Sequence, residues 1–530
     1  MAKPADRQPM IDDPEFQRAV DFIDSGEVDR LKELLDRIPT LLTATAGEDE
    51  TFAGGYFANP RLLWFVAENP IRNGRLPANI AEVTTAIIEA SQTHGVDDLV
   101  KQANYTMSLV TSGLVARECN QQRSLCDVLI AAGADPNSGI TSALAHRETD
   151  ACRTLLDCGA DLTLPLAAGL GMEDETNRLK KAASDELKQE GLIMAAINGQ
   201  HRTTRILADS GTDLNAFNPP GMHAHSTPLH QAVYSGCLST VCALVTRGAD
   251  PTIKDKIFNG DAMGWANEAG HTHLIEFFNE ASIMKIPIQC IREGHVEDLQ
   301  VWLAEHADRV NDTLGDNPRT LLHYATDWPG FLPRVAESIT ALIEAGADVN
   351  ARYTGPATQA AETPLHWTAS SDDIDAARVL IDAGADLNST GGCIGNGTPL
   401  TLAVIFQKWR VAEALVEAGA IISLPLVSGM GRLDLVKTFF DSEDRFVNPY
   451  PTMPHTDTVS DAEGQLNGAV CLSAMAGRQE VLEFLLARGG DVNATSPVET
   501  TALDEAINNG HEEVAEYLKA AGARRFADLK

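Results

Sequence analysis

The sequence has 530 residues, and 41 Lys and Arg stand against 75 Asp and Glu, so the formal net charge is −34. This excess of negative charge repels phosphate backbones and anionic lipid, which argues against nucleic-acid and membrane-surface binding. A hydrophobic content of 44% argues against a disordered chain. We therefore expect a folded protein that binds protein partners with basic or neutral surfaces, no nucleic acid and no membrane.

The N-terminal segment is polar and carries no apolar core of a signal peptide, so we expect residues 1–13 to form a flexible N-terminus. No apolar run is long enough to span a membrane. The nine cysteines are scattered without a Cys-x-x-Cys pair, which favours free thiols in a reducing compartment over a disulfide or metal framework. These features predict a cytoplasmic protein.

After this segment, the sequence predicts pairs of short helices separated by a turn. The first pair covers residues 16–35, where Gly26 marks the turn between two segments of helical apolar spacing. A further pair is predicted from helices at 107–116 and 124–137, and another follows at 142–162. The pattern is degenerate in this part of the chain, because each pair keeps the apolar spacing and changes most other residues.

The clearest pair covers residues 227–250. Thr227 is a good N-cap, and Pro228 at the first helical position starts a helix without losing a hydrogen bond. Gly236 and Gly248 can adopt the left-handed conformation that ends a helix. Neither helix is long enough to be stable alone in water, so this unit must stack on neighbouring copies of itself.

Copies of this pair recur toward the C-terminus. They begin at Thr363, Thr398 and Thr501. The first two copies are 35 residues apart, a period typical of solenoid proteins. The pattern resembles the ankyrin repeat, whose motif is TPLHxAA, a glycine, an apolar second helix and GADVN. Residues 227–230 and 363–366 match the first part in full, and residues 346–350 match the last part.

The resemblance implies an all-α fold, a solenoid of stacked helix-turn-helix units with several long loop insertions. Within the chain, Asn59 and Leu164 begin short motifs that recur in the same order at Asn317 and Leu424. We therefore interpret the chain as two related ankyrin-repeat blocks joined near residues 279–286. The first block covers residues 14–283 and the second covers residues 284–530.

Three histidines near the clearest repeat are candidate metal ligands. His223, His225 and His230 fall within eight residues, and His-x-His can place two imidazoles on one side of an extended segment. His230 belongs to the repeat motif, where it is expected to be structural. A loop stabilised by the prolines and histidines is the simpler interpretation, and a metal-dependent activity at His223 and His225 is kept as an alternative.

No other motif indicates catalysis or a cofactor. The glycine-rich segment 391–397 lacks the lysine of a phosphate-binding loop and occupies the hairpin before a repeat. No Gly-x-Ser-x-Gly motif is present. Repeat solenoids also lack the deep pocket that enzymes use. We expect no enzyme activity, no cofactor, no catalytic residue and no metal site.

The resemblance implies that the two residues after TPLHxAA, with the hairpin tips, face the concave groove. The candidate partner-binding residues are Tyr234, Trp328, Ser370, Ser371, Ile405 and Phe406. Trp328 and Phe406 are large apolar groups where solvent favours polar ones, so they are candidate anchors. The alternative is that they pack beneath insertions, for instance Trp328 beneath Phe331 and Leu332.

The sequence thus predicts a non-catalytic scaffold or adaptor that binds a partner protein in the concave groove of an ankyrin solenoid. Each half could hold its own partner. A second hypothesis is an acidic regulatory or inhibitory subunit that masks a basic surface. Salt separates the two hypotheses, because an electrostatic complex is lost at moderate salt and an aromatic-anchored one persists.

Overall fold

The computed structural model describes residues 11, 13–46, 59–69, 71–279, 284–313, 318–353, 361–449, 461–496 and 498–529. These residues form helices, joined by loops that contain four isolated β-bridges. The all-α fold predicted from the sequence is therefore confirmed. The predicted flexible N-terminus, 1–13, lies outside the described residues except for residues 11 and 13.

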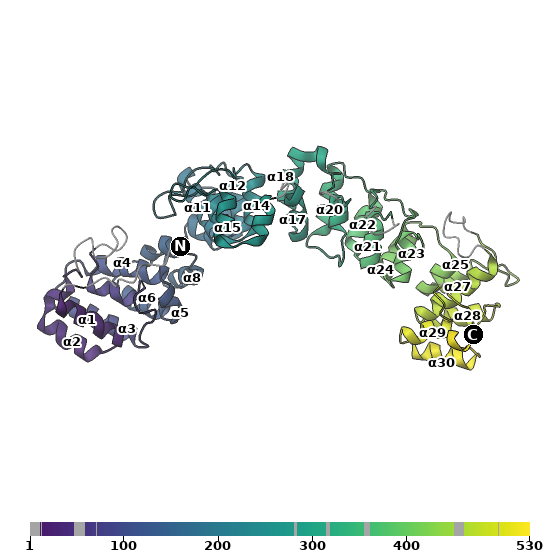
Figure 1. Ribbon diagram of the computed structural model, residues 1–530, viewed down its shortest axis with the longest axis horizontal. Coiled ribbons are helices and arrows are strands. Elements are labelled where there is room, and N and C mark those ends of the chain that lie inside the picture. The colour runs from purple at the N-terminus through teal and green to yellow at the C-terminus, as the bar shows by residue number, and fades with distance from the viewer. Residues whose placement is uncertain are drawn as a thin grey trace. The chain divides into compact units, whose positions relative to one another are not determined.

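The chain divides into two compact units, Met1–Glu280 (unit 1) and Ala281–Lys530 (unit 2), and Figure 1 shows the helices of each. The helices of unit 1 are α1 (Pro14–Ser25), α2 (Val28–Arg37), η1 (Pro39–Leu42), η2 (Leu62–Ala67), α3 (Ile80–Thr93), α4 (Leu99–Ser112), α5 (Leu114–Glu118), α6 (Gln122–Ala131), η3 (Pro136–Gly139), α7 (Ile140–Ala145), α8 (Thr149–Asp157), α9 (Leu164–Gly169), α10 (Glu173–Leu179), α11 (Asp185–Ile197), α12 (His201–Ala208), α13 (Pro228–Ser235), α14 (Leu238–Thr246), α15 (Ala262–Ala269) and α16 (Thr272–Asn279). That the two units arose by duplication stays a prediction.

The helices of unit 2 are α17 (Lys285–Glu293), α18 (Val296–His306), η5 (Ala307–Arg309), α19 (Leu321–Ala325), α20 (Val335–Glu344), α21 (Pro364–Ser371), α22 (Ile374–Asp382), α23 (Pro399–Ile405), α24 (Trp409–Glu417), α25 (Leu424–Met430), α26 (Leu433–Lys437), α27 (Ala462–Met475), α28 (Gln479–Leu486), α29 (Ala502–Asn508), α30 (Glu512–Ala520) and η6 (Phe526–Asp528). They alternate between a first and a second helix of each repeat.

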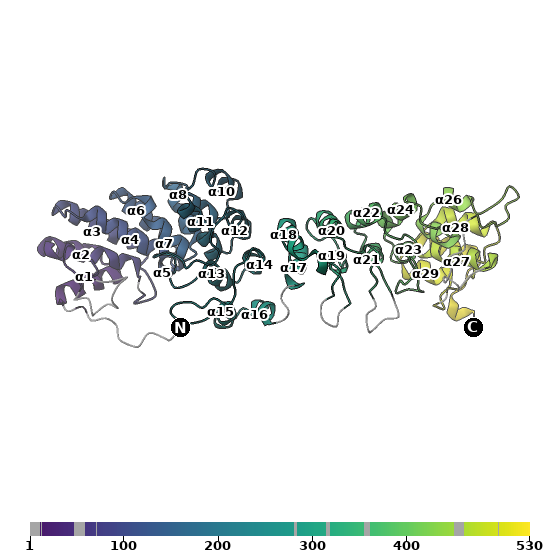
Figure 2. The same cartoon turned by 90° about the horizontal axis from the view of Figure 1, so that it is seen from above.

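Within each unit the first helices pack on one another and form one layer. In unit 1 this layer runs through α1, η2, α4, α7, α9, α11, α13 and α15. In unit 2 it runs through α17, α19, α21, α23, α25, α27 and α29. The second helices form the other layer, for example α18, α20, α22 and α24, and Figure 2 shows successive pairs side by side within each unit. The core lies between the two layers, where the apolar stripes of both helices meet.

His230 has a structural role in the repeat. Its Nδ1 accepts the backbone N–H of the N-cap residue Thr227 (3.2 Å), and its Nε2 donates to the Gly260 carbonyl of the next repeat (3.1 Å). The ring is therefore the neutral tautomer protonated at Nε2. Burial lowers the pKa of His230, which favours this neutral form. The histidine thus satisfies the start of one helix and ties two repeats together.

The same arrangement recurs twice in unit 2, where Thr320 pairs with His323 and Thr363 pairs with His366. The Nε2 of His323 donates to the Glu362 carbonyl at 3.3 Å. Burial lowers the pKa of His323 to about 4, so this ring is neutral at physiological pH. The Thr-x-x-His motif is therefore a hydrogen-bonded connection between repeats.

α4 and α27 are the longest first helices among the described residues, followed by α11 with 13 residues. α4 and α27 each have 14 residues, whereas α13 and α21, which start at Thr-Pro caps, have eight. α27 starts early because the carboxylate of Asp461 accepts the Gly464 N–H (2.9 Å) and caps the helix. The N-terminal turns of α4 and α27 extend past the shorter helices beside them. No helix in the described part of the chain is long and apolar enough to cross a membrane.

Candidate functional site

An exposed aromatic loop in unit 2, residues 326–334, connects α19 to α20. Trp328 is 78% exposed and Phe331 is 55% exposed, so neither ring is covered by the insertion around it. Asp327 accepts the Trp328 N–H (3.0 Å), and Asp373 of the next repeat accepts the Phe331 N–H (2.6 Å). The loop backbone is therefore held in place while its two aromatic side chains face solvent.

Ile405 and Phe406, at the end of α23, lie in different surroundings. Phe406 is exposed. Ile405 lines a hollow of about 690 Å³ whose walls come from α23, α25, α27 and the hairpins between repeats. We call this cavity the unit 2 hollow, and Ile421, Leu426 and Leu472 also line it. The structure thus places Ile405 in an apolar recess on the first-helix side of unit 2.

The remaining predicted residues differ in exposure. Ser371 is only 7% exposed, and its hydroxyl donates to the Trp367 carbonyl of its own helix (3.1 Å), which removes it from the surface. Ser370 is half-buried. Tyr234, in unit 1, is exposed, and the Arg147 guanidinium lies 4.8 Å from the centre of its ring. A role in partner binding stays a prediction for Ser370 and Tyr234.

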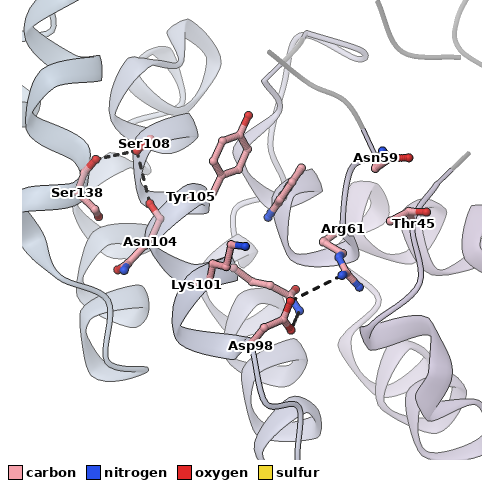
Figure 3. Close-up of a pocket in the computed structure, with 11 residues that line it drawn as sticks. Thr45, Asn59, Arg61, Asp98, Lys101, Asn104, Tyr105, Ser108 and Ser138 are labelled. Atoms are coloured by element: carbon pink, nitrogen blue, oxygen red, sulfur yellow. Dashed lines mark hydrogen bonds and ion pairs between the residues drawn. The ribbon is translucent and has the colours of Figure 1, made fainter. Parts of the chain in front are cut away.

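A second cavity, of about 540 Å³, lies in unit 1 against α4 (Figure 3). We call it the unit 1 hollow. Trp64 of η2 and Tyr105 of α4 form its aromatic wall, with ring centroids 4.2 Å apart and ring planes tilted by 43°. Figure 3 shows Arg61 reaching toward Asp98, at 3.7 Å, while Lys101 and Tyr105 project from the same side of α4. The sequence analysis identified none of these residues as a candidate.

Comparison with known proteins assigns the repeat. The family model described as ankyrin repeats (3 copies) matches residues 164–255, 287–390 and 334–425. The chain is an ankyrin-repeat protein. It is 25% identical over 270 residues to Ankyrin repeat and KH domain-containing protein mask-1 of Caenorhabditis elegans, a match that covers 50% of this chain. The chain spans 8% of the length of that relative. Ankyrin repeats are protein–protein interaction modules and are typically non-catalytic.

The ranges matched by the ankyrin model leave out α4 and α27, the two 14-residue first helices, although they include the 13-residue α11. α4 and the whole lining of the unit 1 hollow precede residue 164, and α27 follows residue 425. The unit 2 hollow is matched only on its α23 side and at the start of α25. Both hollows therefore lie where this ankyrin-repeat chain departs from the regular repeat.

An aromatic cluster in unit 2 surrounds Arg319. The guanidinium carbon lies 5.9 Å, 5.8 Å and 5.0 Å from the ring centres of Tyr324, Tyr353 and Trp367. Arg319 also forms an ion pair with Asp327 at 2.6 Å. The cluster connects the first helices α19 and α21 to the hairpin between repeats. It therefore braces the base of the exposed aromatic loop.

Unit 1 also presents apolar side chains on a hydrogen-bonded loop before α15. Asp255 is buried, and its carboxylate accepts the N–H groups of Ile257 (2.9 Å), Phe258 (2.7 Å) and Gly260 (2.8 Å) and the indole N–H of Trp265 (3.1 Å). Burial alone raises the pKa of Asp255, but these hydrogen bonds outweigh it and lower the pKa to about 2. Ile257 and Phe258 are 65% and 74% exposed. The signal missed in the sequence is the pair Asn259-Gly260, four residues after Asp255, which is typical of turns.

The histidine loop of unit 1 has partners within the protein. His223 pairs through Nε2 with the Ala145 carbonyl (2.9 Å), and burial lowers the pKa of this imidazole. His225 stacks on Trp265 with ring centroids 5.8 Å apart. The centroids of His223 and His225 are 6.3 Å apart, with the rings nearly perpendicular. These contacts fit a loop stabilised by its histidines, and the metal hypothesis stays untested.

Proposed function

We propose that this ankyrin-repeat chain is a non-catalytic scaffold that grips a partner protein on the first-helix side of unit 2. The observation that carries the proposal is the loop in which Asp327 and Asp373 fix the backbone while Trp328 and Phe331 stay exposed. Large exposed aromatics on a rigid backbone lose little conformational entropy when a partner covers them, which is typical of binding anchors.

The unit 2 hollow supplies the second part of the proposed surface. Its apolar wall includes Ile405 and Leu426, and a glycine of α27, Gly468, keeps the helix close to Pro425. A Cβ atom at Gly468 would lie 3.3 Å from the Pro425 ring, so the glycine preserves the shape of the recess. A partner that inserts an apolar side chain here and covers Trp328 would bury surface that is now exposed to water.

Two substitutions test this proposal on the intact chain. A partner is first isolated by affinity capture and then purified, and its Kd is measured for the wild type and for Trp328→Ala with Phe406→Ala. We expect a loss of about thirtyfold or more, the size of a hot-spot residue, with unchanged circular dichroism. Arg378→Ala, at an exposed residue of the second helix α22, is the control and should bind normally.

An unchanged Kd for the double variant would reject the unit 2 surface as the binding site. Equal losses for the double variant and for Arg378→Ala would also reject it, because the effect would then be general. We further propose that unit 1 binds a separate partner, which makes the chain an adaptor in the cytoplasm. This adaptor role predicts that the double variant loses affinity for the unit 2 partner and keeps its affinity for the separate unit 1 partner.

The acidic-mask hypothesis is supported by a second observation. Arginines near the aromatic loop are already neutralised within the chain, Arg319 by Asp327 (2.6 Å) and Arg410 by Asp372 (3.1 Å). The chain also carries an excess of carboxylates over Lys and Arg, with a net charge of −34. If the partner is basic and held by these charges, raising the salt from low to moderate concentration dissociates the complex. Persistence at moderate salt rejects this second hypothesis.

A further inference from the structure

A group of neighbouring rings in unit 1 forms a surface that shares no residue with either hollow. The ring centroid of Phe258, in the loop before α15, lies 6.0 Å from that of His225, and His225 stacks on Trp265 at 5.8 Å. Tyr234, in the last turn of α13, lies 6.0 Å from Trp265. We call these four rings, together with Ile257, the unit 1 aromatic strip. Its exposed members are Ile257, Phe258 and Tyr234.

Hydrogen bonds fix the backbone beneath the most exposed part of the strip. The buried Asp255 carboxylate accepts the N–H groups of Ile257 (2.9 Å) and Phe258 (2.7 Å). The Lys256 N–H donates to the His225 carbonyl (2.8 Å), which joins this loop to the loop before α13. The two apolar side chains are therefore presented to solvent on a held backbone, and a partner that covers them orders little of the chain.

Three cations adjoin the strip. Lys254 and Lys256 are exposed in the same loop as Phe258, and the Lys256 Nζ lies 3.9 Å from the centre of the Phe217 ring. The Arg147 guanidinium lies 4.8 Å from the centre of the Tyr234 ring. Among the described residues, none of the three cations forms an ion pair with a carboxylate. Each can therefore receive a carboxylate from outside the chain.

The aspartates of the same loop are bonded to N–H groups within the protein. Asp255 is buried, and the half-buried Asp261 accepts an N–H of the first turn of α15 (2.9 Å). The exposed charged side chains of residues 253–261 are thus those of the two lysines. At physiological ionic strength, exposed charges more than about 8 Å apart are largely screened. The net charge of −34 therefore acts weakly on a segment bound at the strip, and the adjoining cations dominate.

We propose that the unit 1 aromatic strip binds an acidic segment of a partner protein in which carboxylates flank apolar side chains. The apolar side chains cover Ile257 and Phe258, and the carboxylates lie beside Lys254, Lys256 and Arg147. This chemistry is opposite to the basic or neutral surface that the net charge of the whole chain favours. The proposal rests on the proposed adaptor role of unit 1, to which it adds the binding surface and the chemistry of the partner.

The test is a titration of the full-length chain, at physiological salt, into the fluorescein-labelled peptide Glu-Glu-Phe-Leu-Glu-Glu, followed by fluorescence anisotropy. We expect saturable binding, weakened about tenfold by Ile257→Ala with Phe258→Ala through loss of apolar contact. Lys254→Glu with Lys256→Glu should also weaken it about tenfold, because two attractive charges become repulsive. All four side chains are exposed, so the variants should fold as the wild type does.

Each pair of substitutions has a matched control in unit 1. Ile71→Ala removes another exposed isoleucine and should bind as the wild type. Lys180→Glu with Lys181→Glu, at two adjacent lysines after α10, changes the net charge by the same amount and should also bind as the wild type. Equal losses for a control and its matched variant would contradict the assignment of the site to the strip.

Two further labelled peptides separate charge from apolar contact. Lys-Lys-Phe-Leu-Lys-Lys should bind more weakly, and equal or tighter binding would overturn the proposal, because the net charge of the chain would then decide. Glu-Glu-Ser-Ser-Glu-Glu should also bind more weakly, and equal binding would show that the strip contributes nothing. Absence of saturable binding by the Phe-Leu acidic peptide would overturn the proposal as well.

The same titration distinguishes the two units. Binding of the acidic peptide should be unchanged in Trp328→Ala with Phe406→Ala. A loss in that variant, with none in the unit 1 variants, would place the peptide site in unit 2 and reject the strip. The Kd of the captured unit 2 partner tests the proposed function separately, so failure of one proposal is distinguishable from failure of the other.

Discussion

The unit 1 and unit 2 hollows are formed in the same way and lined by different chemistry. Each lies beside a 14-residue first helix, α4 or α27, whose neighbours η2 and α25 have six and seven residues. At about 1.5 Å per residue, a helix of this length is about 10 Å longer than its neighbour. The extra turns stand beyond the neighbouring repeat and provide one wall of the hollow.

The side chains that lie one turn apart on each long helix determine the chemistry of that wall. On α4, Lys101 and Tyr105 present a cation and a phenol ring. On α27, Gly464 and Gly468 leave a smooth wall, and Leu472 extends its apolar part. Side chains at helical spacing on these two helices therefore set the chemistry of each hollow. We expect the two hollows to bind different ligands.

The largest predicted effect is confined to unit 1. Asp255→Ala should lower the free energy of unfolding around α13 to α15 by about 3 kcal/mol, since four donors lose a buried acceptor. Hydrogen exchange followed by mass spectrometry measures it, with α19 to α23 of unit 2 as the internal reference. Equal deprotection of both units, or no change in unit 1, contradicts the role assigned to Asp255.

Acid should act on unit 2 through His323. Burial lowers its folded pKa to about 4, below the ordinary 6.5, so the unfolded chain binds more protons below pH 6.5. The stabilisation is complete above pH 6.5 and is lost as the pH falls toward 4. We expect a loss of about 2 kcal/mol at pH 5 relative to pH 7.5, measured by urea unfolding. His323→Gln, which cannot titrate, should remove this part of the pH dependence, and an unchanged dependence contradicts the assignment.

The regular repeats could be predicted from sequence because the motif carries its own hydrogen bonds. α13, α21 and α23 begin at Pro228, Pro364 and Pro399, directly after the predicted threonine caps. The long helices could not be predicted. The sequence predicts a helix over residues 107–116, but α4 starts at Leu99. The N-terminal turns of α4 present a polar face toward the unit 1 hollow. Helical turns with a polar face lack the apolar spacing from which a helix is predicted.

The candidate site could be predicted only in part. The exposure of Trp328 follows from its place after a first helix, where the loop leaves the core. Ser371 is buried and does not face the groove as predicted. α21 continues to this residue, and the Ser371 hydroxyl donates to a carbonyl of the same helix. Trp64 and Tyr105 come from repeats that lack the TPLH motif, so nothing in the sequence indicated that their rings meet.

A smaller effect should come from the aromatic wall of the unit 1 hollow. Tyr105→Leu removes the contact with Trp64 and should lower the free energy of unfolding by about 1 kcal/mol. Tyr105→Phe keeps the ring and should be nearly neutral. Urea unfolding of the three proteins compares them, and a phenylalanine variant as unstable as the leucine variant would show that the hydroxyl, not the ring, is the stabilising group.

The smallest effect should be Trp328→Ala, because the ring is largely exposed and buries little area. We expect a change in the free energy of unfolding below about 0.5 kcal/mol. Thermal unfolding of the variant beside the wild type measures it. A loss above about 2 kcal/mol would mean that the ring packs on the protein, and it would no longer qualify as a free anchor.

The most direct test of the account is hydrogen exchange on the full-length chain bound to its purified partner. The account predicts slower exchange on binding in residues 326–334 and in the segments that line the unit 2 hollow, which are α23, the start of α25 and the first turns of α27. Exchange on the second-helix side, in α20, α22 and α24, should not change. Protection confined to those second helices, with none in the aromatic loop or the hollow, would contradict it.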